Sequence, residues 1–284
     1  MKKAKIAAVG GDLRIYFAAN ILADMGYDVF VFGNTLHTEP EGKAVISETL
    51  ERALKDADLL LLPLPYSRDM IHLHAPLSTL PITLHELFSK TDEKTKIAAG
   101  MAENIPTRFE VFDYINDEEY TQRNALATAE GALATLIKET KVTVSGLAIL
   151  LLGYGRIAKI LARMLSFLGA NVTVCARNPL DRVLAETENL KAISFDKLES
   201  AVQDTSVIIN TVPYPVIDEA VVKNAPDDLL IIELASLPGG CNKKAVEERG
   251  LRLVNAPGLP GKYSPISAAR ACALYVQKII EQNY

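Results

Sequence analysis

The most constraining feature of the sequence is an apolar hexapeptide that runs directly into a glycine turn. Residues 147–152 read LAILLL, and the next six residues read GYGRIA. An all-apolar run of this length is typical of a central parallel strand, which is buried on both faces. Residues 157–168 then carry apolar side chains at helical spacing, and Gly169 follows. The sequence therefore predicts a strand, a tight turn and a helix, in that order.

This strand, turn and helix have the spacing of a dinucleotide-binding loop. Gly153 permits the tight turn, Gly155 lets the backbone approach a pyrophosphate, and Ala158 replaces the third glycine of the fingerprint. The free N–H groups at the start of the helix favour a negative charge. We predict that a dinucleotide binds to Gly153, Tyr154, Gly155, Arg156 and Ile157. A tight turn without a ligand is the alternative.

The end of the next strand, at 171–176, bears on the choice of cofactor. An NAD site usually has Asp or Glu there to bind the ribose hydroxyls, whereas this chain has Ala176, Arg177 and Asn178. Arginine can hold a 2′-phosphate through two hydrogen bonds, so these residues favour NADP. Asp181 lies close by and leaves NAD possible, and Arg177 as a solvated surface residue is the alternative.

Short apolar runs alternate with helical patterns along the whole chain, which indicates an α/β fold. We predict two domains: a smaller N-terminal α/β domain at 1–119 and a C-terminal Rossmann domain, a doubly wound parallel sheet, at 120–284. Strands are expected at 4–9, 27–32, 58–62, 96–101, 147–152, 171–176, 192–195, 206–212, 229–234 and 251–254. Helices are expected at 13–25, 47–55, 117–139 and 267–281, and the sequence does not decide which domain the last helix joins.

The helix at 117–139 is the predicted connector between the domains. Asn116, with Glu119 three residues later, has the pattern of an N-cap with its reciprocal acid. Thr128, Glu130 and Gly131 lie in mid-helix, where a glycine costs about 1 kcal/mol relative to alanine. Something must therefore approach Gly131 closely. Packing of another helix and binding of substrate by these three residues are equal alternatives.

Three loops follow successive strands of the second domain, at the edge where ligands bind in open α/β sheets. The first is Asn210-Thr211-Val212-Pro213, the second spans 235–240, and the third spans 256–261. Their small residues, prolines and glycines suit close approach of a flat ring. We expect the cofactor to contact Asn210, Thr211, Val212, Pro213, Ala235, Ser236 and Gly258, and the substrate to contact Gly239 and Gly240. Ordinary turn chemistry is the alternative for any one loop.

The first domain also begins with a strand that runs into a glycine turn, at Gly10 and Gly11. Asp12 follows, and Arg14 adds a cation in the first turn of the helix. Such a turn suits a carboxylate, so Gly10, Gly11, Asp12 and Arg14 are candidate substrate-binding residues. It lacks the full dinucleotide spacing. A purely structural turn, with Asp12 as the helix cap, is the alternative.

Composition excludes several classes of function. The net charge is −5 and no run of Lys and Arg could follow a phosphodiester backbone, so we expect no nucleic acid partner. No segment approaches the roughly 18 apolar residues of a membrane span, and we expect a cytoplasmic protein. The three cysteines are far apart and the histidines form no ligand pattern, so we expect reduced thiols and no metal site. These residues are Cys175, Cys241 and Cys272, and His37, His72, His74 and His85.

Five segments together resemble the family of dipicolinate synthase A subunits. They are residues 10–14 (GGDLR), 128–131 (TAEG), 153–156 (GYGR), 234–240 (LASLPGG) and 256–261 (APGLPG). The resemblance implies a sporulation enzyme that oxidises dihydrodipicolinate to dipicolinate together with a separate B subunit, in the mother cell. It implies a small dicarboxylate as substrate, and we also expect a homo-oligomer. No catalytic base can be assigned.

Two other interpretations stay open. The order of the domains also resembles that of D-2-hydroxyacid dehydrogenases, but that family uses a late histidine as acid and base, and no histidine follows His85 here. The second interpretation is a non-catalytic, cofactor-binding subunit that depends on a partner for the chemistry.

Overall fold

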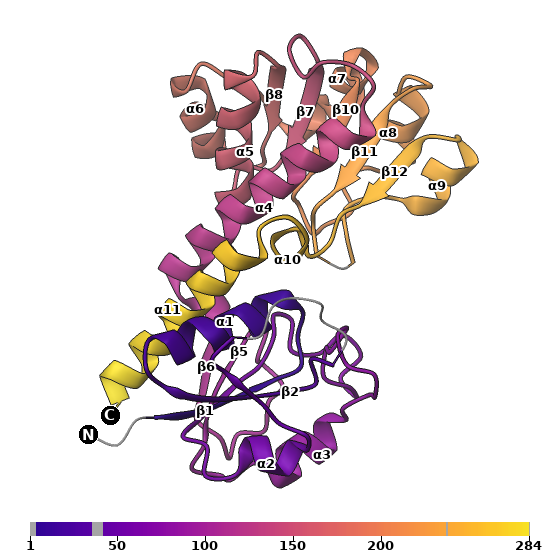
Figure 1. Cartoon of the computed structure of the whole chain (residues 1–284). Helices are drawn as coiled ribbons and strands as arrows, with labels where there is room; N and C mark the ends of the chain where they lie inside the picture. Colours follow the sequence, from indigo (N-terminus) through magenta and orange to yellow (C-terminus); the bar gives the residue numbers. More distant parts are fainter. Residues whose placement is uncertain (1–3, 36–41, 237, 284) are drawn as a thin grey trace. The chain divides into compact units, whose positions relative to one another are not determined.

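The computed structural model describes residues 4–35, 42–236 and 238–283, and the chain divides into two α/β units (Figure 1). Unit 1 comprises Met1–Asn124 and Ser264–Tyr284, and unit 2 comprises Ala125–Tyr263. Both units contain a six-stranded, fully parallel sheet, which confirms the predicted fold class. His37 and Leu237, which the sequence analysis covered, lie outside the described residues.

The sheet of unit 1 has the strand order β3-β2-β1-β4-β5-β6. Short apolar stretches such as KIAAV and LLL form its central strands, and almost all of their side chains are buried. The strands are β1 (Lys5–Val9), β2 (Asp28–Phe32), β3 (Val45–Ile46), β4 (Leu59–Leu61), β5 (Lys96–Ala99) and β6 (Val111–Asp113). The two strands at the edges of the sheet, β3 and β6, are not among the strands predicted from the sequence.

Helices cover both faces of this sheet, because alternate residues of each strand point to opposite sides. Ile6 and Ala8 of β1 pack with α1 (Leu13–Asp24) and α11 (Pro265–Asn283). Ala7 and Val9 pack on the other side with α2 (Leu50–Leu54) and α3 (Leu84–Lys90).

The sheet of unit 2 has the order β12-β11-β10-β7-β8-β9. Counted along the chain within the unit, this is the 3-2-1-4-5-6 order of the Rossmann fold, as predicted. The strands are β7 (Ala148–Leu152), β8 (Asn171–Cys175), β9 (Lys191–Ile193), β10 (Val207–Asn210), β11 (Leu230–Glu233) and β12 (Arg252–Asn255). The sheet of unit 1 has the same order when its strands are counted in the same way.

Two cores flank the second sheet. One contains Ile149 and Leu151 of β7 together with the side chains of four helices: α4 (Glu118–Glu139), α5 (Arg156–Phe167), α6 (Pro179–Thr187) and α10 (Leu259–Tyr263). The other contains Leu150 and Leu152 together with α7 (Leu198–Ala201), α8 (Glu219–Asn224) and α9 (Lys243–Glu248). Helix α5 buries one stripe of small and apolar residues, which is why the predicted helix forms here.

Helix α4 begins one residue later than predicted. The expected N-cap, Asn116, is instead the last residue of a short 3₁₀ helix, Tyr114–Asn116. Asp117 takes over the capping role, because its Oδ1 accepts a hydrogen bond from the backbone N–H of Tyr120 at 2.8 Å. The prediction of a long helix was correct, and its cap was wrong by one position.

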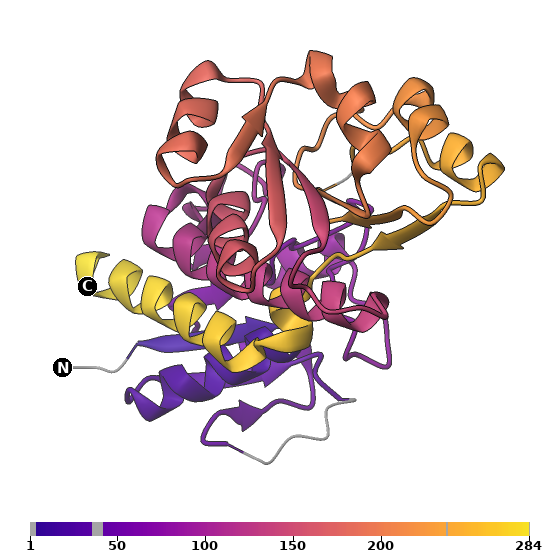
Figure 2. The same cartoon turned by 90° about the horizontal axis from the view of Figure 1, so that it is seen from above.

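Helix α11 packs along α1 (Figure 2). Its residues Ala269, Ala273 and Val276 belong to the same buried cluster as the apolar residues of α1. Ser264–Tyr284 therefore groups with unit 1, whereas the predicted range of the second domain ran to residue 284. As a result the two units are of similar length, and the first is not the smaller. In the described part of the chain, no helix combines the length and apolar character that crossing a bilayer requires.

Candidate cofactor and substrate sites

The turn after β7 has the backbone geometry that its glycine was expected to provide. Gly153 adopts φ +93°, a left-handed conformation that side chains disfavour. Its N–H donates to the carbonyl of Cys175, the last residue of β8, at 2.8 Å. A Cβ at this position would lie 2.5 Å from Oγ1 of Thr211, so even alanine would collide. Gly153 therefore brings the phosphate loop, residues 153–158, into contact with the loop after β10.

The N-terminus of α5 is open. Gly155 is its N-cap and supplies no side-chain hydrogen bond, and the first turn contains no acidic residue. Apart from Gly155 and its two neighbours in the chain, no heavy atom lies within 4 Å of the place where a Cβ of Gly155 would stand. A helix N-terminus of this kind is where a phosphate group binds, because backbone N–H groups and the helix dipole favour negative charge there. The residues of this loop therefore fit the pyrophosphate of a dinucleotide.

The three other predicted residues of the loop differ from one another in burial. The side chain of Tyr154 is only 3 % exposed and packs into the core, so its main chain alone borders the loop. Burial raises the pKa of Tyr154 to about 12. Ile157 is partly buried against the same core. Arg156 is exposed at the first position of α5.

The turn after β8 presents Arg177 to solvent. Ala176 is buried, and Asn178 caps α6 by accepting a hydrogen bond from the N–H of Leu180 at 3.0 Å. Within the described residues, no hydrogen bond or ion pair engages the guanidinium of Arg177. Arg182, which the sequence analysis did not consider, donates from Nη1 to the carbonyls of both Ala176 and Arg177. It thereby fixes the backbone from which Arg177 extends.

The loops after β10 and β11 are joined by a buried carboxylate. Asn210 ends β10 and Glu233 ends β11, and the two residues lie opposite each other in the register of the sheet. Asn210 Nδ2 donates to Glu233 Oε1 at 2.8 Å. Gly240, a predicted substrate-binding residue, donates its N–H to Glu233 Oε2 at 3.0 Å, so this N–H already has a partner within the chain. Glu233 is not among the site residues predicted from the sequence.

The remaining predicted residues of these loops are exposed or partly buried. Val212 accepts a hydrogen bond from Asn210 at its carbonyl and donates its N–H to Asn210 Oδ1. Ser236 is exposed, and Ala235 donates its N–H to Glu233. Pro213, Gly239 and Gly258 also lie at this edge of the sheet, each following one of the three strands β10, β11 and β12. The structure thus brings the three predicted loops of unit 2 to one edge.

The close approach expected at Gly131 is made by another helix of unit 2. A Cβ on Gly131 would lie 2.8 Å from Cβ of Leu259 and 3.2 Å from the ring of Tyr263, both in α10. Helix packing therefore accounts for this glycine. Thr128, which lies in α4 with Gly131, is buried, whereas Glu130 of the same helix α4 is exposed.

In the glycine turn of unit 1, the backbone N–H groups and the helix cap are engaged by groups of the chain itself. Gly10 donates its N–H to the carbonyl of Phe32, and Gly11 donates to that of His74, both at 2.8 Å. Asp12 is the N-cap of α1, and its Oδ1 accepts a hydrogen bond from the N–H of Arg14 at 3.0 Å. A carboxylate of the chain itself therefore occupies the anion position of this helix N-terminus.

Arg14 is held within unit 1 by two partners. Its Nε lies 2.9 Å from Asp12 Oδ1, and its Nη2 donates to the carbonyl of Leu64 at 3.0 Å. Burial lowers the pKa of Arg14, but the hydrogen bond and charge of Asp12 outweigh this effect and raise it. Burial likewise raises the pKa of Asp12, yet Arg14 holds it below its usual value. The two side chains stay charged as a pair.

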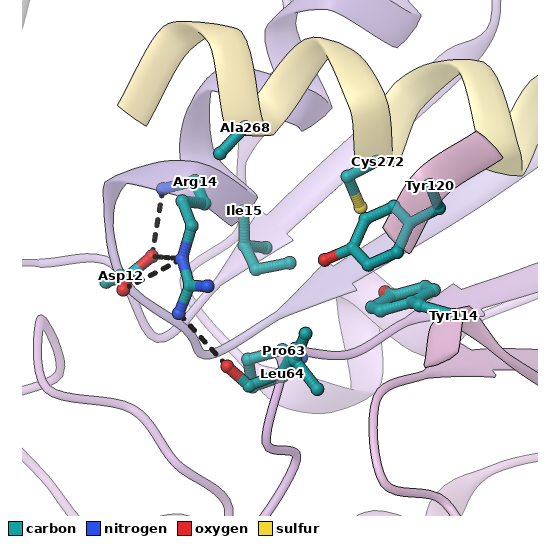
Figure 3. A pocket seen from close by; sticks show the side chains of 9 residues that line it. All are labelled: Asp12, Arg14, Ile15, Pro63, Leu64, Tyr114, Tyr120, Ala268 and Cys272. Carbon is teal, nitrogen blue, oxygen red and sulfur yellow. Dashed lines mark hydrogen bonds and ion pairs between the residues drawn. The ribbon is translucent and has the colours of Figure 1, made fainter. Parts of the chain in front are cut away.

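A small cavity lies beside this ion pair (Figure 3). The hydroxyl of Tyr120 and the guanidinium of Arg14 both border it, and the thiol of Cys272 lies next to the tyrosine ring (Figure 3). Its volume of about 10 Å³ is close to the minimum for one water molecule. It is too small for a ring substrate. The lining comprises Asp12, Arg14, Ile15, Pro63, Leu64, Tyr114, Tyr120, Ala268 and Cys272.

The cysteines do not form a reactive site. Burial raises the pKa of Cys175 and of Cys272 to about 12, and that of Cys241 to about 11. Thiols with such values are protonated at neutral pH and are poor nucleophiles. Within the described part of the chain, no three His, Cys, Asp or Glu side chains gather as a ligand set for a metal ion.

Comparison with known proteins finds two family matches, one in the N-terminal part of the chain and one in the C-terminal part. Residues 5–108 match the family model of the N-terminal domain of the dipicolinate synthase A subunit. Residues 118–236 match that of the NAD binding domain of D-isomer specific 2-hydroxyacid dehydrogenases. The fold and the open phosphate loop therefore define a dehydrogenase-like protein, an oxidoreductase by class, with a domain for a nicotinamide cofactor.

The particular relative is the A subunit of dipicolinate synthase, and the resemblance spans the whole chain. The protein of that name from Bacillus subtilis (strain 168) is 27 % identical over 98 % of this chain and 96 % of its own length. Its crystal structure superposes with a TM-score of 0.85, covering 99 % of this chain and 97 % of that one. The corresponding protein from Bacillus halodurans is 25 % identical, with a TM-score of 0.87 and 97 % of each chain covered. The resemblance stated from the sequence is confirmed.

Proposed function

We propose that this protein is the A subunit of a dipicolinate synthase, which oxidises dihydrodipicolinate with NADP and works with a separate B subunit. The observation that carries the proposal is the resemblance to two such proteins along the full length of both units. The open N-terminus of α5 supports the cofactor part.

The proposed reaction requires little covalent chemistry from the protein itself. The dihydropyridine ring gives up one hydrogen as a hydride and one as a proton, and it becomes aromatic. A bound nicotinamide cofactor supplies the hydride acceptor. The chain has to orient the ring and hold its two carboxylates, so cationic and N–H groups matter more than a nucleophile.

We assign NADP rather than NAD because of the turn after β8. Arg177 is exposed and, within the described residues, no acceptor of the chain occupies its guanidinium, so a 2′-phosphate could bind there. Asp181 lies on the first turn of α6 and is the feature that would favour NAD. The relative affinity of the two cofactors decides between them.

For a substrate carboxylate we propose Arg14 of unit 1, the cation beside the glycine turn. Because the N–H groups of Gly10 and Gly11 are bound within the chain, the contribution of that turn rests on Arg14 and its partner Asp12. We further propose that the protein acts in the cytoplasm of the mother cell during sporulation, as a homo-oligomer.

The test is an assay of the purified chain with dihydrodipicolinate and NADP, with and without a B subunit. NADPH fluorescence reports the hydride transfer, and chromatography reports dipicolinate. Formation of both products in either mixture supports the proposal. NADPH binding without product in both mixtures would leave a non-catalytic cofactor-binding subunit. NADPH formation only with a D-2-hydroxyacid would assign the chain to that class of dehydrogenase instead.

A further inference from the structure

Glu233 is a buried carboxylate that organises the carboxyl edge of the second sheet. Its side chain is 5 % exposed, and that of its neighbour Asn210 is fully buried. Three N–H donors converge on it: Asn210 Nδ2 at 2.8 Å and the backbone of Ala235 at 3.0 Å on Oε1, and the backbone of Gly240 at 3.0 Å on Oε2. Each oxygen is therefore satisfied, as a buried carboxylate requires.

Gly240 extends this arrangement to the loop after β10. Its carbonyl accepts the N–H groups of Val216 and Ile217 at 3.0 and 2.8 Å. A Cβ on Gly240 would lie 2.3 Å from Asn210 Nδ2 and 2.7 Å from the carbonyl of Val212. The Gly240 backbone thus lies inside the loop that follows β10, and the loops after β10 and β11 form one unit.

Thr211 connects this unit to the phosphate loop. Its N–H and its Oγ1 both donate to the carbonyl of Leu152, at 3.0 and 2.7 Å. Leu152 immediately precedes Gly153, whose α-carbon faces Thr211. A continuous series of contacts therefore runs from the phosphate loop through Thr211 and Asn210 to Glu233 and Gly240.

We propose that Glu233 is a positioning residue, which holds the loops after β10 and β11 in their cofactor-binding shape before the cofactor arrives. These loops follow strands of the second half of the Rossmann sheet, the half that binds the nicotinamide mononucleotide part of a dinucleotide. The inference rests on the nicotinamide-binding part of the proposed function and not on the identity of the substrate. Glu233 itself lies too deep to touch the ligand.

The variant Glu233→Gln tests the role, because it keeps the shape of the side chain and replaces one acceptor by a donor. All three N–H groups already point at the carboxylate, so the amide must oppose at least one of them. We expect NADPH, titrated by its fluorescence, to bind roughly ten- to a hundredfold more weakly. The fragment 2′,5′-ADP, which occupies the other half of the site, should bind as it does to the parent chain.

Asp113 provides a matched control in unit 1. Its carboxylate also accepts three N–H groups, here all from the backbone, of Met101, Ala102 and Ile115 at 3.2, 2.7 and 3.1 Å. Asp113→Asn therefore makes the same chemical change to an equivalent network elsewhere. It should lower the unfolding temperature and leave the affinity for NADPH and for 2′,5′-ADP unchanged.

The outcomes separate positioning from general stability. A selective loss of NADPH affinity in Glu233→Gln supports the proposal, and equal losses for both ligands or no loss for either overturn it. If that variant binds no 2′,5′-ADP because it does not fold, hydrogen exchange in the unliganded parent decides. Slow exchange of the Gly240 amide supports a loop that is preformed, and exchange at the rate of an unstructured peptide refutes it. None of these measurements depends on the dihydrodipicolinate reaction.

Discussion

Replacing Gly155 by serine should abolish dinucleotide binding without harming the fold. Gly155 has φ −80° and ψ −169°, an extended conformation that any residue adopts, and no atom lies within 4 Å of the added Cβ. Serine is also a better N-cap than glycine by a few tenths of a kcal/mol, because its Oγ accepts a first-turn N–H. We therefore expect the unfolding temperature of Gly155→Ser to stay level or to rise slightly.

The same side chain occupies the space in front of α5 and competes for its N–H groups. Charge-assisted hydrogen bonds contribute about 1.5–3 kcal/mol each, so the loss of two would cost about 3 kcal/mol or more, which exceeds a hundredfold in affinity. Fluorescence titration with NADPH measures the affinity, and differential scanning fluorimetry measures the unfolding temperature. Binding within about threefold of the parent chain would refute the assignment of this loop to the pyrophosphate.

Two other glycine variants serve as comparisons for Gly155→Ser. Gly153→Ala should damage both properties, because φ is +93° and the Cβ would meet Thr211 Oγ1 at 2.5 Å. Gly250→Ala adds a Cβ in open space at φ +71°, so it should cost about 1 kcal/mol of stability through backbone strain alone and leave NADPH binding unchanged. Stability and affinity thus change independently at Gly155 and Gly250, and together at Gly153.

Three further predictions concern other parts of the chain. Arg177→Asp should weaken NADPH binding by tenfold or more and leave NADH binding unchanged or tighter, since it places a carboxylate beside the 2′-phosphate; an unchanged ratio of the two dissociation constants would argue against the NADP assignment. The pKa of Asp12 is lowered in the folded chain, so the stability difference between the parent and Asp12→Asn should be complete above the usual value of 3.8 and shrink as the pH falls through the folded pKa. Urea unfolding at several pH values measures it, and a difference that grows with acid would contradict the Asp12–Arg14 pair. Because the pKa of Cys241 is raised from 9.0 to about 11, iodoacetamide should label it about a hundredfold more slowly in the folded chain than in urea, and equal rates would show that its thiol is not shielded.

The strand, glycine turn and helix at residues 147–167 could be predicted from sequence because their determinants are local. An apolar strand, two glycines and an amphipathic helix lie within 21 consecutive residues, from Leu147 to Phe167, and each has its own propensity for the structure it forms. The determinants of β1 and α1 are local in the same way. The short edge strand β3, Val45–Ile46, has no such run, since both of its side chains are exposed. Its strand conformation depends on pairing with β2, which the sequence does not display.

The role of Glu233 depended on a distance that the sequence does not give. Asn210 and Glu233 are 23 residues apart, and they meet only because β10 and β11 pair in register. One signal was present: each is a polar residue that ends a four-residue strand whose other three side chains are apolar and buried. A buried polar residue needs a partner, so two such residues at adjacent strand ends predict each other once the strand order is known. Helix α11 offered no comparable signal, because an amphipathic pattern does not specify which sheet it covers.

The two sheets share one strand order, yet only one glycine turn is open to an anion, and their local contacts explain why. In both units the glycine after the first strand donates its N–H to the end of the second strand, Gly10 to Phe32 and Gly153 to Cys175. The turns then diverge. Unit 1 places Asp12 at the helix N-cap, where its carboxylate takes the first-turn N–H and binds Arg14, so a phosphate there would meet like charge. Unit 2 places Gly155 at the equivalent cap, which has no side chain to accept an N–H and leaves the space beside its α-carbon open. One side chain at the helix N-cap therefore distinguishes the turn that can bind a dinucleotide from the one that supports the fold.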